Sequence, residues 1–142
     1  MAAGQEVPTV KAPGGSGTFV ASVSGTTLSW KLTFRKLSGP AVAAHIHLGR
    51  SGKAGQVLVS LCGPCKSGVS GKTVLTSSQL KTILGGGTYV NVHTAINKNG
   101  EIRGQVSKIG TTSTAPPAAP APPTTTPTTP TPPTTTTPKY SY

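Results

Sequence analysis

Acidic residues are almost absent from this chain. Its 142 residues include no aspartate, and Glu6 and Glu101 are the only glutamates. Calcium and magnesium sites in proteins need several oxygen ligands, so the sequence argues against both ions. The same shortage leaves 13 lysine and arginine side chains largely uncompensated, and the formal net charge of +11 favours anionic partners.

Aromatic residues and long apolar runs are scarce as well. Aromatic side chains make up 4% of the residues, and the lysines are scattered along the chain. Nucleic acids are usually bound by clustered cations with stacking aromatics, so no specific nucleic-acid site is predicted. An anionic cell-surface polymer or another protein is a candidate partner, and the oligomeric state is not indicated. No run approaches the ~18 apolar residues of a membrane span, and none is predicted.

The C-terminal part of the chain lacks the apolar side chains that a core needs. From Thr111 to Pro138 it is almost wholly Thr, Pro, Ala and Ser, and ten of the fourteen prolines lie there. Such a segment buries too little apolar surface to offset the entropy of ordering, so residues 111–142 are predicted to be a disordered, extended tail. Residues 1–110 are predicted to form one folded domain.

The rest of the chain alternates apolar and polar residues. LSWKLTFRK (28–36) places its apolar side chains on one face, as in a half-buried β-strand. In GQVLVSLC the residues expected to point inward are Val57, Val59 and Leu61. The same alternation occurs at residues 17–25, 41–48, 55–62, 88–96 and 100–109.

One segment has helical spacing instead. In TSSQLKTILGGG the apolar residues Leu80, Ile83 and Leu84 recur three and four apart, Thr76 or Ser77 is a suitable N-cap, and Gly85 is a suitable end. Seven or eight short strands with one short helix predict an all-β fold, an antiparallel Greek-key sandwich or barrel.

All three histidines lie in two predicted strands. In AVAAHIHL, Ile46 points inward, so His45 and His47 share the outer face, and in TYVNVHTA the inward valines leave His93 outward. If these strands are neighbours, three imidazoles meet on one face. Imidazole ligation favours copper, with zinc as the alternative, so these residues are the candidate metal ligands.

Four further polar side chains are predicted on the same face. Tyr89, Asn91 and Glu101 are expected to fix the imidazole tautomers, with Tyr89 or water completing the metal shell, and Arg103 lies beside them. In the alternative interpretation a covering loop buries the imidazoles, each bonded to a backbone carbonyl or to Glu101, and these polar groups knit the sheet together without a metal.

The two cysteines lie in LCGPCKSG. A small structural disulfide between Cys62 and Cys65 is the leading interpretation. Thiol–disulfide exchange is an alternative, but it needs a helix directly after the motif, and the Gly/Ser-rich KSGVSGK that follows is unsuitable for one. A metal site built from cysteine and histidine is the third interpretation.

The segments GQEVPTV, AHIHLGRSGKAGQVLVSL and GGGTYVNVHTAINKNGEIRGQV, in that order, resemble the CHRD domain family from about Gly4 to Ile109. The resemblance implies an extracellular β-sandwich module of the kind found in many secreted bacterial proteins, and it implies no particular enzymatic activity.

A more distant similarity connects the His-x-His strand and the late Arg103 with the copper–zinc superoxide dismutase sandwich. It implies copper ligands at His45, His47 and His93 and an anion guide at Arg103. The chain departs from that pattern, because it has no aspartate and no long loop with further histidines, so a dismutase-like enzyme is kept as an alternative.

The expected location is outside the cell or in the periplasm, with attachment to the cell surface included. A paired-cysteine motif and a Thr/Pro-rich stalk are typical of exported proteins. MAAGQEVPTV lacks the apolar run of a signal peptide, so the sequence is expected to begin at a mature N-terminus with Met1 added for expression. The predicted function is a secreted, non-enzymatic binding module for copper or zinc, and a metal-free structural or adhesive module is the alternative.

Overall fold

The computed structural model describes residues 1–10, 14–107 and 109–111. Of the predicted tail, only Thr111 belongs to the described residues, so the prediction of disorder over 112–142 lies outside them. Within the described residues, no helix has the length and apolar character to cross a membrane.

A long hairpin organises the first sheet. Strands β1 (Ser16–Ser24) and β2 (Thr27–Arg35) pair along their whole length. Their turn begins at Gly25, whose φ of 57° lies in the left-handed region that a glycine adopts without strain. The alternation in LSWKLTFRK therefore predicted this strand correctly.

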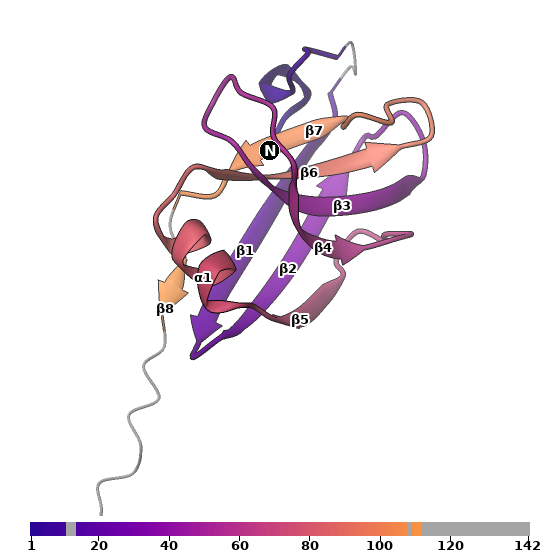
Figure 1. The fold of residues 1–142 in the computed structure, drawn as a ribbon. Helices are drawn as coiled ribbons and strands as arrows, with labels where there is room; N and C mark the ends of the chain where they lie inside the picture. The colour runs from indigo at the N-terminus through magenta and orange to yellow at the C-terminus, as the bar shows by residue number, and fades with distance from the viewer. Residues whose placement is uncertain (11–13, 108, 112–142) are drawn as a thin grey trace, which may run out of the picture.

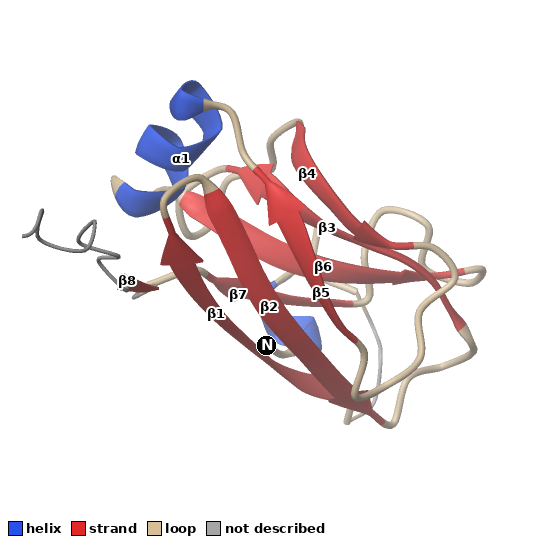
Figure 2. Ribbon diagram, turned by 90° about the horizontal axis from the view of Figure 1, so that it is seen from below, coloured by secondary structure: helices blue, strands red, loops and turns tan. Residues whose placement is uncertain are grey.

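The described strands form two four-stranded sheets, ordered β5-β2-β1-β8 and β4-β3-β6-β7. Figures 1 and 2 show them packed face to face. The remaining elements are η1 (Ala3–Gln5), β3 (Ala41–Leu48), β4 (Val57–Cys62), β5 (Ser70–Val74), α1 (Ser77–Leu84), β6 (Thr88–Thr94), β7 (Ile102–Gln105) and β8 (Gly110–Thr111). The all-β prediction with one short helix is confirmed.

The core lies between the two sheets. Leu28 and Leu32 from the first sheet and Ile46, Val90 and Ile102 from the second are fully buried there. These are the positions that the alternation assigned to the inner face, so the sequence pattern also gave the orientation of these strands correctly. The orientation matters for function because it directs the histidines away from the core.

Helix α1 begins and ends where the sequence indicates. The Thr76 side chain accepts a hydrogen bond from the Gln79 backbone N–H, and the Gln79 side chain accepts one from the Thr76 backbone N–H, forming a capping box. Gly85 is the C-cap, and Ile83 is the buried apolar residue of the helix.

Three features of the sheets differ from the prediction. Strand β5 was not expected, because its sequence SGKTV has little apolar character; it pairs with β2 as an edge strand. The pair β1–β8 is parallel, whereas the prediction was antiparallel throughout. Val57 is 49% exposed rather than inward, because the β3–β4 register shifts between Ile46 and His47 and such an irregularity changes which face a side chain occupies.

The N-terminal residues connect the two sheets. Ala2 forms antiparallel bridges to both Ser16 at the start of β1 and Arg103 in β7. Its backbone N–H donates to the Arg103 carbonyl over 2.8 Å, and the Arg103 N–H donates back over 3.1 Å. The segment that includes η1 therefore packs against β7, beside the outer face of the second sheet.

A candidate metal centre of three histidines

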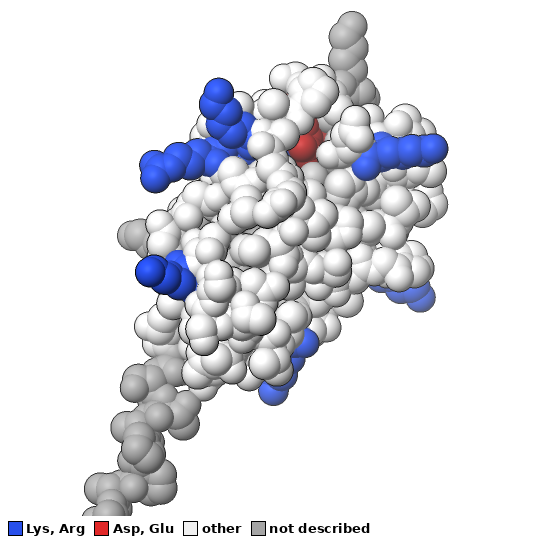
Figure 3. All heavy atoms as spheres, in the orientation of Figure 1, with Lys and Arg blue, Asp and Glu red and all other residues white. Residues whose placement is uncertain are grey.

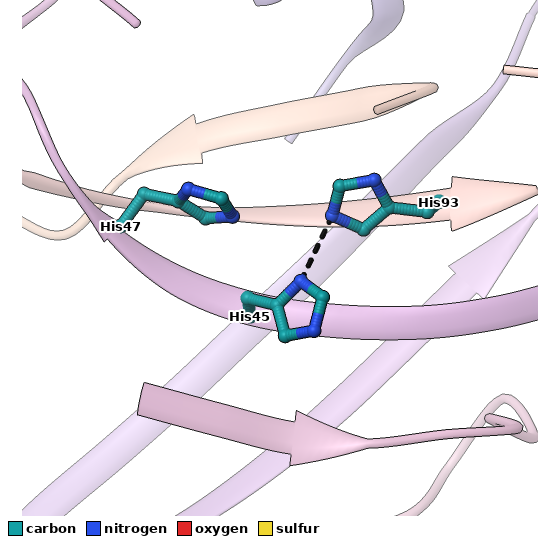
Figure 4. Close-up of side chains that lie close together, drawn as sticks. All are labelled: His45, His47 and His93. Carbon is teal, nitrogen blue, oxygen red and sulfur yellow. Dashed lines mark hydrogen bonds between the residues drawn. The ribbon is translucent and has the colours of Figure 1, made fainter. Parts of the chain in front are cut away.

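The histidine strands β3 and β6 are neighbours in the second sheet. In their antiparallel register His45 faces Asn91 and Ala43 faces His93. Ile46 and Val92 point into the core. The histidines next to them in each strand therefore project from the opposite face. The prediction that the two strands bring all three imidazoles together is thereby met (Figure 4).

The three imidazoles form one compact cluster. Each offers a ring nitrogen, and these three nitrogens lie within 4.8 Å of one another. The ring centroids are 5.6 Å apart for His45 and His47, 4.9 Å for His45 and His93, and 6.0 Å for His47 and His93. His47 and His93 are each 8% exposed, and His45 is half-buried, so the cluster opens to solvent mainly at His45.

Backbone carbonyls fix the tautomers of two of the rings. The Nδ1 of His47 lies 2.9 Å from the Gly55 carbonyl oxygen, and the Nδ1 of His93 lies 2.8 Å from the Lys98 carbonyl oxygen. A carbonyl only accepts, so both Nδ1 atoms carry the proton and both Nε2 atoms keep a free lone pair. The Nε2 of His47 is buried with no hydrogen-bond partner among the described residues.

The His45 ring is oriented by the His93 ring. The Nδ1 of His45 lies 3.0 Å from the Nε2 of His93. Since the neutral His93 ring carries its proton on Nδ1, the His45 Nδ1 is the donor in this contact. That proton therefore occupies the space between two ligand nitrogens. A metal ion would take its place once the His45 proton moves to Nε2 or to solvent.

The surroundings favour the neutral form of His45 and His93. Burial lowers the pKa of His45 below its ordinary 6.5, and the neighbouring His93 and His47 rings lower it further. Burial also lowers the pKa of His93; the hydrogen bond to Lys98 opposes this shift and His47 adds to it. Neutral imidazoles are the form that binds a metal, so the cluster is prepared for one at neutral pH.

The loop over residues 49–56 covers the outer face beside His47. Arg103, which is 1% exposed, donates through Nη2 to the carbonyl oxygens of Arg50 and Lys53 at 2.9 and 2.8 Å. Its guanidinium carbon lies 3.4 Å from the centroid of the Tyr89 ring. The Tyr89 ring also stacks on His47, with centroids 5.0 Å apart and planes 12° from parallel. The imidazole and the guanidinium thus both pack against the phenol ring.

The Tyr89 hydroxyl bonds to the loop over residues 49–56. It is turned toward the loop, where it accepts from the Gly55 N–H at 3.2 Å and donates to the Gly55 carbonyl. The hydroxyl is therefore engaged by Gly55, and the Tyr89 ring packs on His47.

Glu101 is buried, but it does not orient an imidazole. Its carboxylate accepts from the Ser38 N–H at 2.5 Å, from the Ser38 and Thr94 hydroxyls at 2.6 Å each, and from the Asn97 amide at 3.0 Å. Burial alone would raise the pKa of Glu101, but these hydrogen bonds outweigh it and lower the pKa below 4.5. Glu101 thus fastens the loop before β3 to the β6–β7 connection, and it contacts neither an imidazole nor Arg103 in these hydrogen bonds.

Asn91 is paired with His45 across β3 and β6, and Glu6 interacts with Asn91. Asn91 donates to the Asn99 carbonyl at 3.4 Å, and its Oδ1 is buried with no hydrogen-bond partner among the described residues. Glu6 is 4% exposed, and burial raises its pKa to about 7 against the opposing influence of Arg103, the Val7 N–H and Asn91. Sequence reasoning missed Glu6. The available signals were that Glu6 is one of only two acidic residues and that it lies in the GQEVPTV segment.

The cysteines are separate from this cluster. Cys62 and Cys65 form a disulfide with Cα atoms 5.4 Å apart, and the Cys65 backbone N–H donates to the Ala41 carbonyl. Both sulfurs are bonded to each other, so the structure does not support the cysteine–histidine metal site. The bond closes a short loop after β4, next to the first residue of the histidine strand β3.

Comparison with known proteins identifies the family. Neither the curated proteins nor the solved structures contain a match to this chain. A family model, the CHRD domain, matches residues 1–106, which is most of the chain and includes the histidine cluster, Glu6, the disulfide and Arg103. The resemblance seen in the sequence motifs is therefore confirmed: the chain belongs to the CHRD domain family.

Proposed function

We propose that this chain is an extracellular, non-enzymatic CHRD module that binds copper, with zinc as the alternative, through His45, His47 and His93. One observation carries the proposal. Three ring nitrogens from two strands lie within 4.8 Å of one another, and the buried Nε2 of His47 has no hydrogen-bond partner among the described residues. A buried nitrogen lone pair without a partner is costly unless something binds it.

The donor set fits these metals. Metal–nitrogen bonds are about 2.0–2.1 Å long, so two ligand nitrogens on one ion are about 3–4 Å apart. Nitrogens within 4.8 Å of one another need only small side-chain shifts to reach that spacing. Copper and zinc both accept imidazole, while the group contains no carboxylate of the kind that calcium or magnesium requires.

The disulfide supports an extracellular location, and the charge distribution supports an anionic partner. A Cys62–Cys65 bond persists in an oxidising compartment and is rare in the cytosol. Lysine and arginine side chains are spread over the face seen in Figure 3, and only a small acidic area reaches that surface. Such a surface favours a dispersed attraction to an anionic cell-surface polymer over a defined protein-binding patch.

A second candidate function is favoured by a different observation. All three imidazoles already make hydrogen bonds, two of them to loop carbonyls that hold the covering segments in place. The cluster would then be a structural device of a metal-free adhesive module. The two candidates differ in what happens when one ligand is removed.

Isothermal titration of the tag-free protein with Cu(II) and Zn(II) separates them. Wild type is expected to bind one equivalent tightly, and His47→Ala is expected to lose that binding while its circular dichroism spectrum is retained. Val57→Ala is the matched control, because Val57 faces His47 across the β3–β4 pair and offers no donor nitrogen. Equal weak binding by wild type and His47→Ala, or unfolding of His47→Ala, supports the structural function instead.

A further inference from the structure

The cluster supplies three neutral nitrogen ligands and no fourth donor among the described residues. The group of close ligand atoms contains only His45, His47 and His93. The nearby Tyr89 hydroxyl bonds to Gly55. The Glu101 carboxylate accepts four hydrogen bonds from Ser38, Thr94 and Asn97, so it is committed elsewhere.

A three-nitrogen set suits some metal ions better than others. Zinc prefers four ligands in a tetrahedron, and Cu(II) prefers a tetragonal arrangement of nitrogen and oxygen ligands. Cu(I) has a filled d shell and is stable with few ligands, so three imidazoles complete its shell without water. The burial of His47 and His93 leaves mainly the His45 side open to the water that the other two ions would need.

A permanent buried charge lies next to the cluster. The Arg103 guanidinium and the His47 imidazole both pack against the Tyr89 ring. Its hydrogen bonds go to oxygen atoms of Arg50, Lys53 and Gln105, which are neutral groups. Arginine stays charged at all accessible pH values, so each positive charge added at the histidines is repelled in a partly desolvated setting.

The Glu6 carboxylate compensates the Arg103 charge only in part. Glu6 interacts electrostatically with Arg103, but its burial raises its pKa to about 7, so it carries only a partial charge at neutral pH. A divalent ion at the cluster therefore experiences twice the repulsion from Arg103 that a monovalent ion experiences, and Glu6 offsets only part of it.

We propose that the three-histidine cluster selects copper in the Cu(I) state over Cu(II), because it offers three nitrogen ligands without charge and its His47 packs against the same Tyr89 ring as the Arg103 cation. The inference rests on the proposed function and specifies the bound metal as a monovalent d¹⁰ ion. The module is then a holder of reduced copper, and Ag(I) is the redox-inert probe of the same chemistry.

The test compares affinities for the two oxidation states. Cu(I) affinity is measured anaerobically by competition with a chromogenic Cu(I) chelator, and Cu(II) affinity by competition with an amino-acid chelator. Cu(I) is expected to bind roughly a hundredfold more tightly than Cu(II). Ag(I) is expected to bind at the same site and to be lost in His47→Ala.

Equal affinities, or tighter Cu(II) binding with a strong Cu(II) paramagnetic resonance signal, overturn the preference for Cu(I) while leaving the proposed metal function intact. Failure of both copper ions and Ag(I) to bind overturns the proposed function itself. The two failures are thus distinguishable in one set of titrations.

The Arg103 contribution has its own variants. Arg103→Gln removes the charge and is expected to lower the Cu(I)/Cu(II) affinity ratio by roughly tenfold, whereas Arg103→Lys keeps the charge and is expected to keep most of the ratio. Tyr89→Phe loses the Gly55 hydrogen bonds without a change of charge and is expected to leave the ratio unchanged. An equal fall in all three variants shows that packing, not charge, sets the ratio and contradicts this part of the proposal.

Discussion

The strands of the two sheets share the same alternation of apolar and polar residues, but their outer faces differ in burial. Strand β2 alternates along its nine residues, with Leu28, Trp30 and Leu32 buried and Lys31 exposed. Strand β6 alternates in the same way between valines and polar residues, yet all seven of its residues are buried. The period-two pattern therefore identifies the inward face of a strand, but it does not tell whether the outward face is covered. The covered outer face carries the histidine cluster.

The largest expected difference between the sheets concerns the buried carboxylate. Replacing Glu101 by Ala leaves the Ser38, Thr94 and Asn97 donors without their acceptor in a buried place, so the free energy of unfolding is expected to fall by about 3–5 kcal/mol. Lys31→Ala on the open sheet is the control and is expected to change it by less than about 0.5 kcal/mol. Urea denaturation measures both, and similar losses would remove the contrast between the sheets.

Glu6 is expected to act in the opposite direction, because its charge is costly where it lies. Its pKa is about 7 when folded and 4.5 as the ordinary value, so the folded state holds its proton more tightly and loses stability as pH rises from 4.5 through 7. Glu6→Gln removes this loss and is expected to be more stable than wild type at pH 8 by about 1–3 kcal/mol, with little difference at pH 4.5. Stability curves at both pH values test this. A destabilised variant at pH 8 would show that the Glu6 charge is needed beside Arg103.

A smaller pH effect is expected from the histidines. The pKa values of His45 and His93 are lowered in the folded protein, so the unfolded chain binds protons more readily below about pH 6.5 and stability falls there as pH decreases. The effect is best measured in the Glu6→Gln background, where the opposing Glu6 titration is absent. Two-dimensional NMR of the imidazole protons gives the same pKa values directly, and values at or above 6.5 would contradict the burial of the cluster.

The smallest effect is expected from the C-terminal tail. Removing residues 112–142 leaves β8 intact, and the deleted segment has almost no apolar side chains to bury. The thermal midpoint is expected to change by no more than about 2 °C. Differential scanning calorimetry of the two lengths tests this, and a much larger fall would assign the tail a packing role against one of the sheets.

Much of the fold could be predicted because it depends on local patterns. Alternation in LSWKLTFRK and in the two histidine strands gave the strands and their inward faces, and Thr76 with Gln79 marked the helix start. The irregular β3–β4 register, which exposes Val57, depends on long-range pairing that leaves no local mark. Strand β5 forms because an edge of β2 is available to it, and its own sequence contains little to indicate that.

The candidate metal ligands could be predicted from the sequence, but the groups that hold these side chains in place could not. His45, His47 and His93 could be placed on one face by counting residues along two strands. The groups that fix their tautomers are the carbonyls of Gly55 and Lys98, and every residue has a carbonyl, so the sequence cannot single them out. Glu101 was given a role beside the imidazoles because the alternation around Ile102 places it on the same face, but its hydrogen bonds are decided by where the loop with Ser38 folds.

The parallel pairing of β8 with β1 has a mechanical consequence. The N-terminal residues lie near one end of the sandwich and β8 near the other (Figure 1), and Ser22 and Val23 pair with the last described strand in the same chain direction. Tension applied through the C-terminal side therefore runs along these strands and loads their hydrogen bonds in shear, where they share the force. The load passes from β8 into β1 and then into the β1–β2 hairpin of the first sheet.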